Sequence, residues 1–407
     1  MASPTPFGLR TPYSYSPKRC LPGRFGGVLT LLTAILLAVT TSARKFSPSA
    51  FCLRRLVNLL YLIEPQGQVR DPCIPLNETT PQTQYFTSQA DITKYLNCTT
   101  VYDSIVISTT ETTLSLPSIG AFVWNLKITH SPYLTTISAP NLASIGQDFV
   151  LDDLPLLVNL NLSVLESAGR ILWTSLPSLQ EIPAWKPQSV TVPSIPRDGT
   201  YERTPRFIIS HTALAKLDYF ALPSFEQSTS TKAYPSSVLA IMDNRFLDKV
   251  DLGGGLEYGP KNLTVTGNSK SLVLTLSEML EVENATFSDL SGLSVPVLER
   301  SSGTIILRNN SLPKISFPVF EYLPGSLVIE GNDELTELEF PKLSSVGAGI
   351  EGDLRIVGNE RLEIITGFDI LMFASGSMEF RGNFSTYVFC FFIFPLSSKS
   401  QCECFGS

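Results

Sequence analysis

The sequence is poor in the residue types from which active sites and nucleic-acid interfaces are most often built. Its 407 residues include two histidines and seven cysteines, and only 16% of them are charged. Lysine and arginine form no long block and the formal net charge is −7, so we expect no binding to nucleic acid. No cysteine and histidine spacing matches a four-ligand zinc site, and we predict no metal and no cofactor.

Long apolar runs are also missing. The longest near the N-terminus, residues 28–39 (VLTLLTAILLAV), is too short for a stable transmembrane helix but has the length of a signal-peptide core. It follows a basic, proline-rich stretch and precedes the small residues Thr41, Ser42 and Ala43. Residues 1–43 are therefore predicted to be a signal peptide with a long n-region, an uncleaved signal anchor being the alternative. Residues 44–72 are expected to form a poorly ordered linker.

What the chain does contain is a repeat. Residues 126–146 (LKITHSPYLTTISAPNLASIG) share their apolar offsets, a proline and a closing glycine with the residues that follow Leu327. The matched positions are Ile128, Leu134, Ile137, Pro140, Leu142, Ile145 and Gly146 in one copy, and Ile329, Leu335, Leu338, Pro341, Leu343, Val346 and Gly347 in the other. Self-similarity of this length is typical of a repeat architecture.

The period and composition of the repeat predict the fold. Copies starting at 126, 149 and 171 lie 23 and 22 residues apart, and those starting at 327, 354 and 378 lie 27 and 24 apart. Each copy opens with a short alternation of apolar and polar residues, typical of a strand with one buried face, and none contains a helical stripe. We therefore predict an all-β protein, a right-handed parallel β-solenoid with coils of about 22–27 residues.

A turn position recurs four residues after each strand start. It is occupied by His130, Asp153, Ser175, His211, Asp243, Gly267, Asn309, Gly331, Gly358 and Gly382. These residue types favour a backbone with positive φ, so both histidines are interpreted as turn formers. The next residue is asparagine in six copies: Asn244, Asn268, Asn310, Asn332, Asn359 and Asn383. Separate Asx-turns are the favoured interpretation, and mutual capping along a column is the alternative.

The ends of a solenoid need covering elements. Cys73 and Cys98 bracket a segment in which Ser88 can cap a short helix over residues 89–96, and a Cys73–Cys98 disulfide is the favoured pairing. Cys20 precedes the predicted cleavage point, and no convincing partner is found for Cys52, Cys390, Cys402 or Cys404.

The predicted domains follow the repeat and its interruptions. Residues 73–182 form the cap and a first solenoid, 183–205 a proline-rich loop, and 206–386 a second solenoid. Residues 387–407 are an atypical tail whose apolar part is not terminal, which suggests an incorrectly joined gene model.

Seven Asn-x-Ser/Thr sequons accompany the predicted export signal. They begin at Asn77, Asn97, Asn161, Asn262, Asn284, Asn309 and Asn383. Together with the signal peptide they predict a secreted glycoprotein.

The repeats resemble a known family. The segments SAPNLASIGQDFVLDDLP at 138–155 and FPKLSSVGAGIEGDLRI at 340–356 are similar to the receptor L-domain, leucine-rich-like repeats of fungal GPI-anchored cell-wall-organisation and sporulation-specific wall proteins. The resemblance covers roughly residues 73–385 and includes the Cys73…Cys98 start. It implies an exported protein of the cell wall and outer face of the plasma membrane, with no catalytic residues. The hydrophobic GPI signal of the family is missing here, so membrane association would need a lipid anchor that this sequence does not specify.

We therefore expect a non-catalytic cell-surface glycoprotein, a scaffold or binding surface in fungal wall organisation, with wall polysaccharide or wall and surface proteins as partners. One alternative is a β-helix enzyme acting on wall polysaccharide, with Asp152 and Asp153 as its best acidic pair. Another is a receptor-like ectodomain for a protein ligand. Binding is expected on the outward middle residues of the strands and at Trp185; those strand residues are Lys127, Val150, Leu172, Ile208, Arg355 and Glu379.

Overall fold

A computed structural model describes Cys73, residues 82–182, 206–217, 237–253, 259–348 and 352–382, and the backbone of 402–405. All of these lie in one compact unit, Asp71–Ser407. The predicted signal peptide, the linker, the proline-rich loop with Trp185, and Asn77 and Asn383 fall outside the described residues. Within the described ranges, no helix has the length and apolar character needed to cross a membrane.

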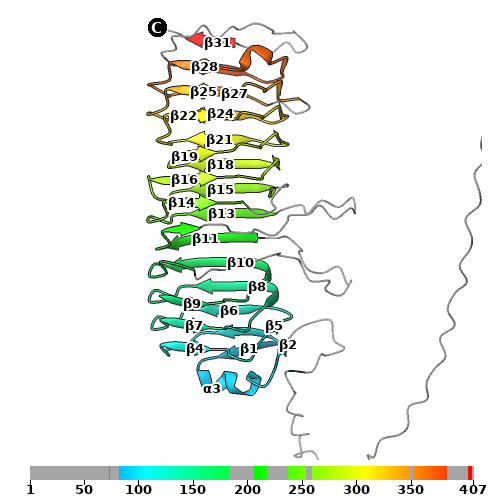
Figure 1. Cartoon of the computed structure of the whole chain (residues 1–407), viewed down its shortest axis with the longest axis vertical. Coiled ribbons are helices and arrows are strands. Elements are labelled where there is room, and N and C mark those ends of the chain that lie inside the picture. The colour runs from blue at the N-terminus through cyan, green and yellow to red at the C-terminus, as the bar shows by residue number, and fades with distance from the viewer. Residues whose placement is uncertain are drawn as a thin grey trace, which may run out of the picture. The chain divides into compact units, whose positions relative to one another are not determined.

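The unit is a parallel β-solenoid, as predicted. Its main sheet takes one strand from each coil in chain order (Figure 1), and every pairing in it is parallel. The strands are β1 (Thr83–Phe86), β3 (Ser104–Ile107), β6 (Leu126–Thr129), β8 (Ser144–Asp152), β10 (Ser167–Leu176), β11 (Arg206–Thr212), β13 (Val238–Met242), β15 (Asn262–Thr266), β18 (Asn284–Ser288), β21 (Ile305–Arg308), β24 (Leu327–Glu330), β27 (Leu354–Val357), β30 (Met378–Arg381) and β31 (Cys402–Phe405). Two short strands, β2 (Thr100–Val101) and β5 (Ala121–Phe122), join it at its N-terminal end.

The strand register reproduces the predicted period. Leu126 pairs with Phe149, Phe149 with Ile171, and Leu327 with Leu354. Strand β10 pairs directly with β11, so the two predicted solenoid segments share one uninterrupted sheet. Strand β31 pairs with β30 and adds a strand beyond the expected end of the ladder at residue 386.

One coil departs from the predicted frame. The apolar residue Val282 between Glu281 and Glu283 predicts a main-sheet strand there, but Val282 ends the short strand β17 (Glu281–Val282), and the main strand of that coil is β18. Two consecutive polar residues, Glu283 and Asn284, interrupt the alternation at the corner between the two strands.

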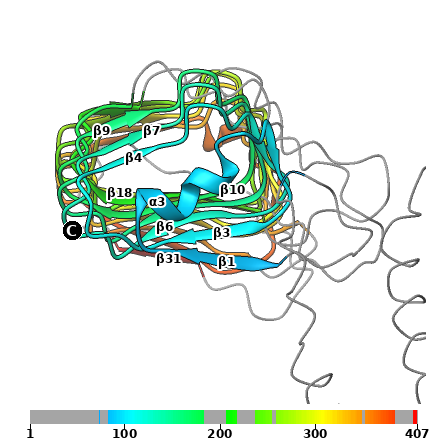
Figure 2. The ribbon, with the colours of Figure 1, turned by 90° about the horizontal axis from the view of Figure 1, so that it is seen from below.

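Two further sides complete each coil. Three short sheets follow one another along the side opposite the main sheet, and β4, β7 and β9 of the first are labelled there in Figure 2. They contain β4 (Thr113–Ser115), β7 (Thr136–Ser138) and β9 (Asn159–Asn161); β12 (Lys216–Leu217), β14 (Lys249–Asp251), β16 (Leu272–Thr275) and β19 (Leu290–Ser294); and β22 (Lys314–Ser316), β25 (Glu337–Glu339) and β28 (Ile364–Thr366). A sheet that we call the third-side sheet contains β17, β20 (Arg300–Ser301), β23 (Tyr322–Leu323), β26 (Ser345–Val346) and β29 (Phe373–Ala374). A 3₁₀ turn, η2 (Phe368–Ile370), precedes β29.

The inward side chains of successive coils form one apolar core. Leu134 and Leu335, which the repeat placed at equivalent positions, are both 0% exposed. The ring of Trp173 packs edge-on against that of Phe149 in the neighbouring coil, with 5.6 Å between centroids. Because each coil buries its apolar residues only against the next, the core exists only in the stack.

Close approach of successive coils explains the glycines that stand two residues before β24 and β27. A Cβ atom built on Gly325 would lie 2.1 Å from the carbonyl oxygen of Gly303, and one on Gly352 would lie 2.3 Å from that of Gly325. No side chain fits at this corner, because it would displace the backbone of the preceding coil.

The turn column has the predicted backbone. The nine positions from His130 to Gly358 all have positive φ, between 49° and 64°, and Asp289 at 61° adds a member that the sequence frame did not include. Each such turn directs the next side chain into the coil, where Asn244, Asn268, Asn310, Asn332 and Asn359 are buried.

The structure shows the mutual-capping alternative for these asparagines instead of separate Asx-turns. The Oδ1 atom of Asn332 accepts hydrogen bonds from the backbone nitrogen and Nδ2 of Asn310 at 3.0 and 2.9 Å. Its own Nδ2 donates to the carbonyl of Leu307 at 3.1 Å and to Oδ1 of Asn359 at 3.0 Å. A buried carboxamide needs partners for both ends, and the coils above and below supply them.

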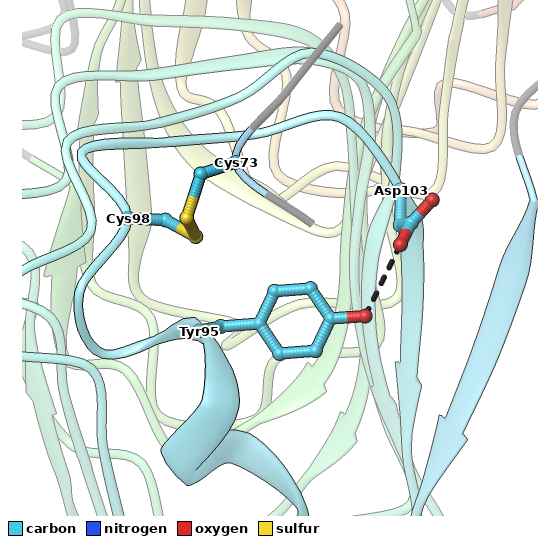
Figure 3. Close-up of a disulfide and its surroundings, with 4 residues drawn as sticks. All are labelled: Cys73, Tyr95, Cys98 and Asp103. Carbon is cyan, nitrogen blue, oxygen red and sulfur yellow. Dashed lines mark hydrogen bonds between the residues drawn. A yellow bond between two sulfur atoms is a disulfide. The ribbon is translucent and has the colours of Figure 1, made fainter. Parts of the chain in front are cut away.

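The N-terminal end is covered by α3 (Gln89–Ile92) and the 3₁₀ turn η1 (Thr93–Tyr95), close to the predicted helix. Ile92 and Tyr95 are buried in the core, and α3 lies in front of the coil interior in Figure 2. The Tyr95 hydroxyl donates to Oδ2 of Asp103 at 3.1 Å, and a disulfide joins Cys73 to Cys98 (Figure 3).

Candidate binding surface

The residues considered for catalysis are dispersed along the turn column. His130, Asp153 and His211 all have positive φ, as turn formers should. The neighbouring Asp152 accepts a hydrogen bond from the Thr174 hydroxyl of the next coil. His211 Nε2 lies 3.7 Å from Oδ2 of Asp243 in the adjacent coil. Among the described residues, no three His, Cys, Asp or Glu side chains lie close enough together to hold a metal ion.

The outward face of the main sheet is arranged as predicted. Val150, Leu172 and Ile208 are register neighbours on β8, β10 and β11, and all are partly exposed. Lys127 precedes them in the same row. Toward the C-terminal end Arg355 and Glu379 occupy this row. The row is thus apolar from Val150 to Ile208, with Lys127 on one side of this stretch and Arg355 and Glu379 toward the C-terminal end.

Polar side chains on this face bind to one another between coils. The carboxylate of Asp148, 8% exposed, forms ion pairs with Lys127 at 3.3 Å and with Arg170. Farther along, Arg355 forms ion pairs with Glu330 at 3.6 Å and with Glu379 at 3.1 Å. Opposite charges alternate in these groups, so this face has no extended patch of one sign.

A similar network lies on the opposite side of the coil. Lys314 Nζ on β22 lies 2.8 Å from Glu337 Oε1 and 3.1 Å from Glu339 Oε2 on β25. The hydrogen bonds to Glu337 and then Glu339 raise the pKa of Lys314. Hydrogen bonds from Lys314 and then from the Ser316 hydroxyl lower the pKa of Glu339.

The described sequons occupy two kinds of environment. Asn97, Asn161 and Asn309 are exposed, on the cap, at the end of β9 and on the turn column. Asn262 and Asn284 are register neighbours and only partly exposed. The Oδ1 atom of Asn284 accepts from the backbone nitrogen of Thr304 at 2.9 Å, and its Nδ2 donates to the carbonyl of Lys261 at 3.3 Å. Asn284 therefore connects three coils. Attachment of glycans at the seven sequons stays a prediction of the sequence, and these contacts argue against it at Asn284.

The structure does not test the aromatic residue that the sequence favoured for binding, Trp185. Trp124 and Trp173 are buried, and Trp185 lies outside the described residues. Instead, Tyr322 and Phe373 of the third-side sheet are 44% and 40% exposed. The strands of this sheet after β17 are only two residues long in the structure, too short for alternation to be recognised in the sequence.

Comparison with known proteins agrees with the fungal wall-protein resemblance. The chain is 29% identical over 260 residues to sporulation-specific protein 2 of Saccharomyces cerevisiae, covering 64% of this chain and 46% of that protein. It is 27% identical over 271 residues to protein ecm33 of Aspergillus fumigatus, covering 66% and 62%. It is 26% identical over 300 residues to a cell surface GPI-anchored protein of Arthroderma benhamiae, covering 74% and 70%. The chain spans less than two thirds of the length of the first two relatives. No family model and no solved structure matches it.

Proposed function

We propose that this chain, a homologue of fungal ecm33, sporulation-specific and GPI-anchored surface proteins, is a non-catalytic glycoprotein of the fungal cell wall. It acts outside the cell, in the wall and at the outer face of the plasma membrane, as a scaffold in wall organisation. Its outward sheet faces bind wall polysaccharide or other wall and surface proteins. Any attachment to the membrane would be through a lipid anchor of the kind named for the Arthroderma benhamiae relative.

The observation that carries this proposal is that outward polar side chains form ion pairs between adjacent coils. Asp148, Arg355 and Lys314 each have ion-pair partners one coil away, so the side chains stabilise the stack and leave long, flat faces. A hydrolase of the rival class would need a separated pair of carboxyl groups facing one bound sugar. The carboxyl groups of Glu337 and Glu339 do lie side by side, but Lys314 is held between them in ion pairs, which supports contact with a polymer or another protein over hydrolysis.

The test uses the purified chain with insoluble β-glucan, chitin and mannan. We expect the protein to co-sediment with at least one polymer and to release no new reducing ends on prolonged incubation. Reproducible release of reducing ends that scales with protein concentration would instead establish the β-helix enzyme. Binding to a purified wall protein but to no polymer would favour the receptor-like alternative.

A further inference from the structure

We infer that Tyr322, Ser345 and Phe373 form a binding platform for neutral polysaccharide on the third-side sheet. The inference rests on the proposed function and identifies one site through which wall polysaccharide would be bound. The three residues come from three successive coils, on β23, β26 and β29. Tyr322 pairs in register with Ser345, and Ser345 with Phe373.

The row faces outward. Leu323 and Val346, the next residues on β23 and β26, are fully buried, and successive side chains on a strand point to opposite faces. Adjacent strands lie about 4.8 Å apart, so Tyr322 and Phe373 are separated by about 10 Å along the stack. Two exposed aromatic side chains thus stand in one row with a small residue between them.

Tyr322 leans along the stack over its neighbour. Its hydroxyl donates to the carbonyl of Ala348, beyond Ser345 in the next coil, at 3.4 Å. The side chain therefore reaches across the row, which accounts for the burial of Ser345 beneath it, while 44% of Tyr322 stays exposed. An aromatic side chain with one apolar face toward solvent and a polar tip can stack on the C–H face of a pyranose.

Ser345 supplies the second, independent observation. The residue is 9% exposed, and its Oγ atom is buried and has no hydrogen-bond partner within the described part of the chain. A buried hydroxyl without a partner is unfavourable, and such a group calls for an explanation. Rotation of the Tyr322 ring, held at its tip by one long hydrogen bond, would open this hydroxyl to a hydroxyl of a bound sugar.

The surroundings favour an uncharged ligand. In the preceding coils of the same row, Arg300 and Glu281 form an ion pair with 2.9 Å between Nε and Oε2, so their charges offset each other. Met372, which precedes Phe373 in the chain, is 73% exposed and is also uncharged. Apolar surface combined with one unpaired hydroxyl suits a polyhydroxyl polymer better than an acidic or basic one.

The experiment compares variants of the full chain in co-sedimentation with insoluble β-glucan, chitin and mannan. Replacing both rings, Tyr322→Ala with Phe373→Ala, should weaken binding to the preferred polymer about ten-fold or more. Ser345→Ala should weaken it several-fold, because one hydrogen bond to the ligand is lost. The matched control is Tyr85→Ala, which removes a 76% exposed aromatic ring on the outward face of β1 and should leave binding unchanged.

Two conservative variants keep the test informative if the double alanine variant unfolds. Tyr322→Phe and Phe373→Trp preserve stacking surfaces and should retain binding, whereas Tyr322→Ser and Phe373→Ser, made singly, should each lose most of it. If the wild type binds a polymer and the folded ring variants bind it equally well, the platform is refuted but the scaffold function stands. If the wild type binds none of the polymers, both proposals for polysaccharide fail. Loss of binding to a wall protein alone, with polymer binding intact, would also overturn the inference.

Discussion

Whether a single polar residue can be buried in this molecule depends on the hydrogen-bond partners in the neighbouring coils. Asparagine is usually found at the surface, yet five asparagines after the turn column are buried. Each is tolerated because its carboxamide donates to a backbone carbonyl of the preceding coil. Asn332, for example, joins Leu307 in the preceding coil to Asn359 in the next one. Leu154, Leu176 and Leu290 take the same position in other coils, so the position itself also accepts an apolar side chain.

Replacing Asn332 tests the column. Leucine is close to asparagine in size, but Asn332→Leu removes a buried hydrogen-bond partner from the backbone nitrogen and Nδ2 of Asn310, from the carbonyl of Leu307 and from Oδ1 of Asn359. We expect a loss of about 3 kcal/mol in the free energy of unfolding, measured by urea titration. The control Asn309→Gly changes the exposed turn residue that precedes Asn310 in the neighbouring coil and keeps its positive φ, so it should be nearly neutral. Equal losses for the two variants would contradict a structural role for the column.

A second prediction at the residue scale concerns which strand residues face the core and which face solvent. Leu338→Asp places an unpaired charge at a 0% exposed position and should cost at least about 3 kcal/mol of stability. Lys127→Ala removes one half-exposed ion-pair partner of Asp148, but Asp148 still has Arg170 as a partner. The variant should therefore lose less than about 1 kcal/mol of stability. Thermal unfolding of both variants checks this, and similar shifts would show that the assignment of faces is wrong.

Among the elements, the N-terminal cap covers the end of the apolar core at the first coil. Helix α3 and turn η1 bury Ile92 and Tyr95 over the first coil, and Asp91 accepts hydrogen bonds from the backbone nitrogens of Thr87 and Ser88 at 2.9 and 3.0 Å. These bonds lower the pKa of Asp91, that from Thr87 contributing most.

The disulfide of the cap provides a prediction at this scale. Cys73 and Cys98 are 25 residues apart, and closing a loop of that length in the unfolded chain is worth about 3 kcal/mol. The double variant Cys73→Ser with Cys98→Ser should be less stable by about that amount in denaturant titration. Wild-type protein treated with a reductant should show the same shift, and the variant treated likewise should show none. An unchanged midpoint in the variant would mean that this bond does not stabilise the cap.

Strands β22 and β25 carry a pH-dependent interaction. The pKa of Glu339 in the folded state is lowered from 4.5. The stability that its interactions with Lys314 and Ser316 contribute to the fold is therefore present above that value and is lost as the pH falls through the lowered pKa. The melting temperature should therefore fall between about pH 5 and pH 3, and less steeply in Glu339→Gln than in the wild type. Glu299→Gln, which removes another exposed carboxylate, is the control and should follow the wild type. Because the Glu339 side chain is 34% exposed, added salt should reduce the difference.

At the scale of the whole molecule, the described sequons are placed at several points around the coil. Asn161 lies on β9, opposite the main sheet, whereas Asn309 ends a main-sheet strand and Asn284 connects three coils there. Glycans on the exposed sites would limit contact on part of the surface and leave the middle of the main sheet, at Val150 and Leu172, uncovered.

Sequon variants test this distribution on secreted protein. Ser311→Ala removes the sequon of the exposed Asn309 and should lower the mass by one glycan. Thr286→Ala removes the sequon of Asn284 without touching its carboxamide, and we expect no change in mass because that amide is bound between coils. Mass spectrometry before and after enzymatic deglycosylation gives the result. A glycan lost in Thr286→Ala would show that Asn284 is accessible after all.

The sequence alone determined the solenoid, its period and its inner face, because a coil cannot bury its apolar residues by itself and so repeats them at fixed offsets. Leu134 and Leu335, and the turn formers from His130 to Gly358, lie where the repeat placed them. The tertiary structure decided what depends on contacts between coils: the asparagine column and the row of Tyr322, Ser345 and Phe373. Those residues are more than 20 positions apart in the chain and become neighbours only through the register of the stack. The register therefore brings together side chains that no local pattern in the sequence relates to one another.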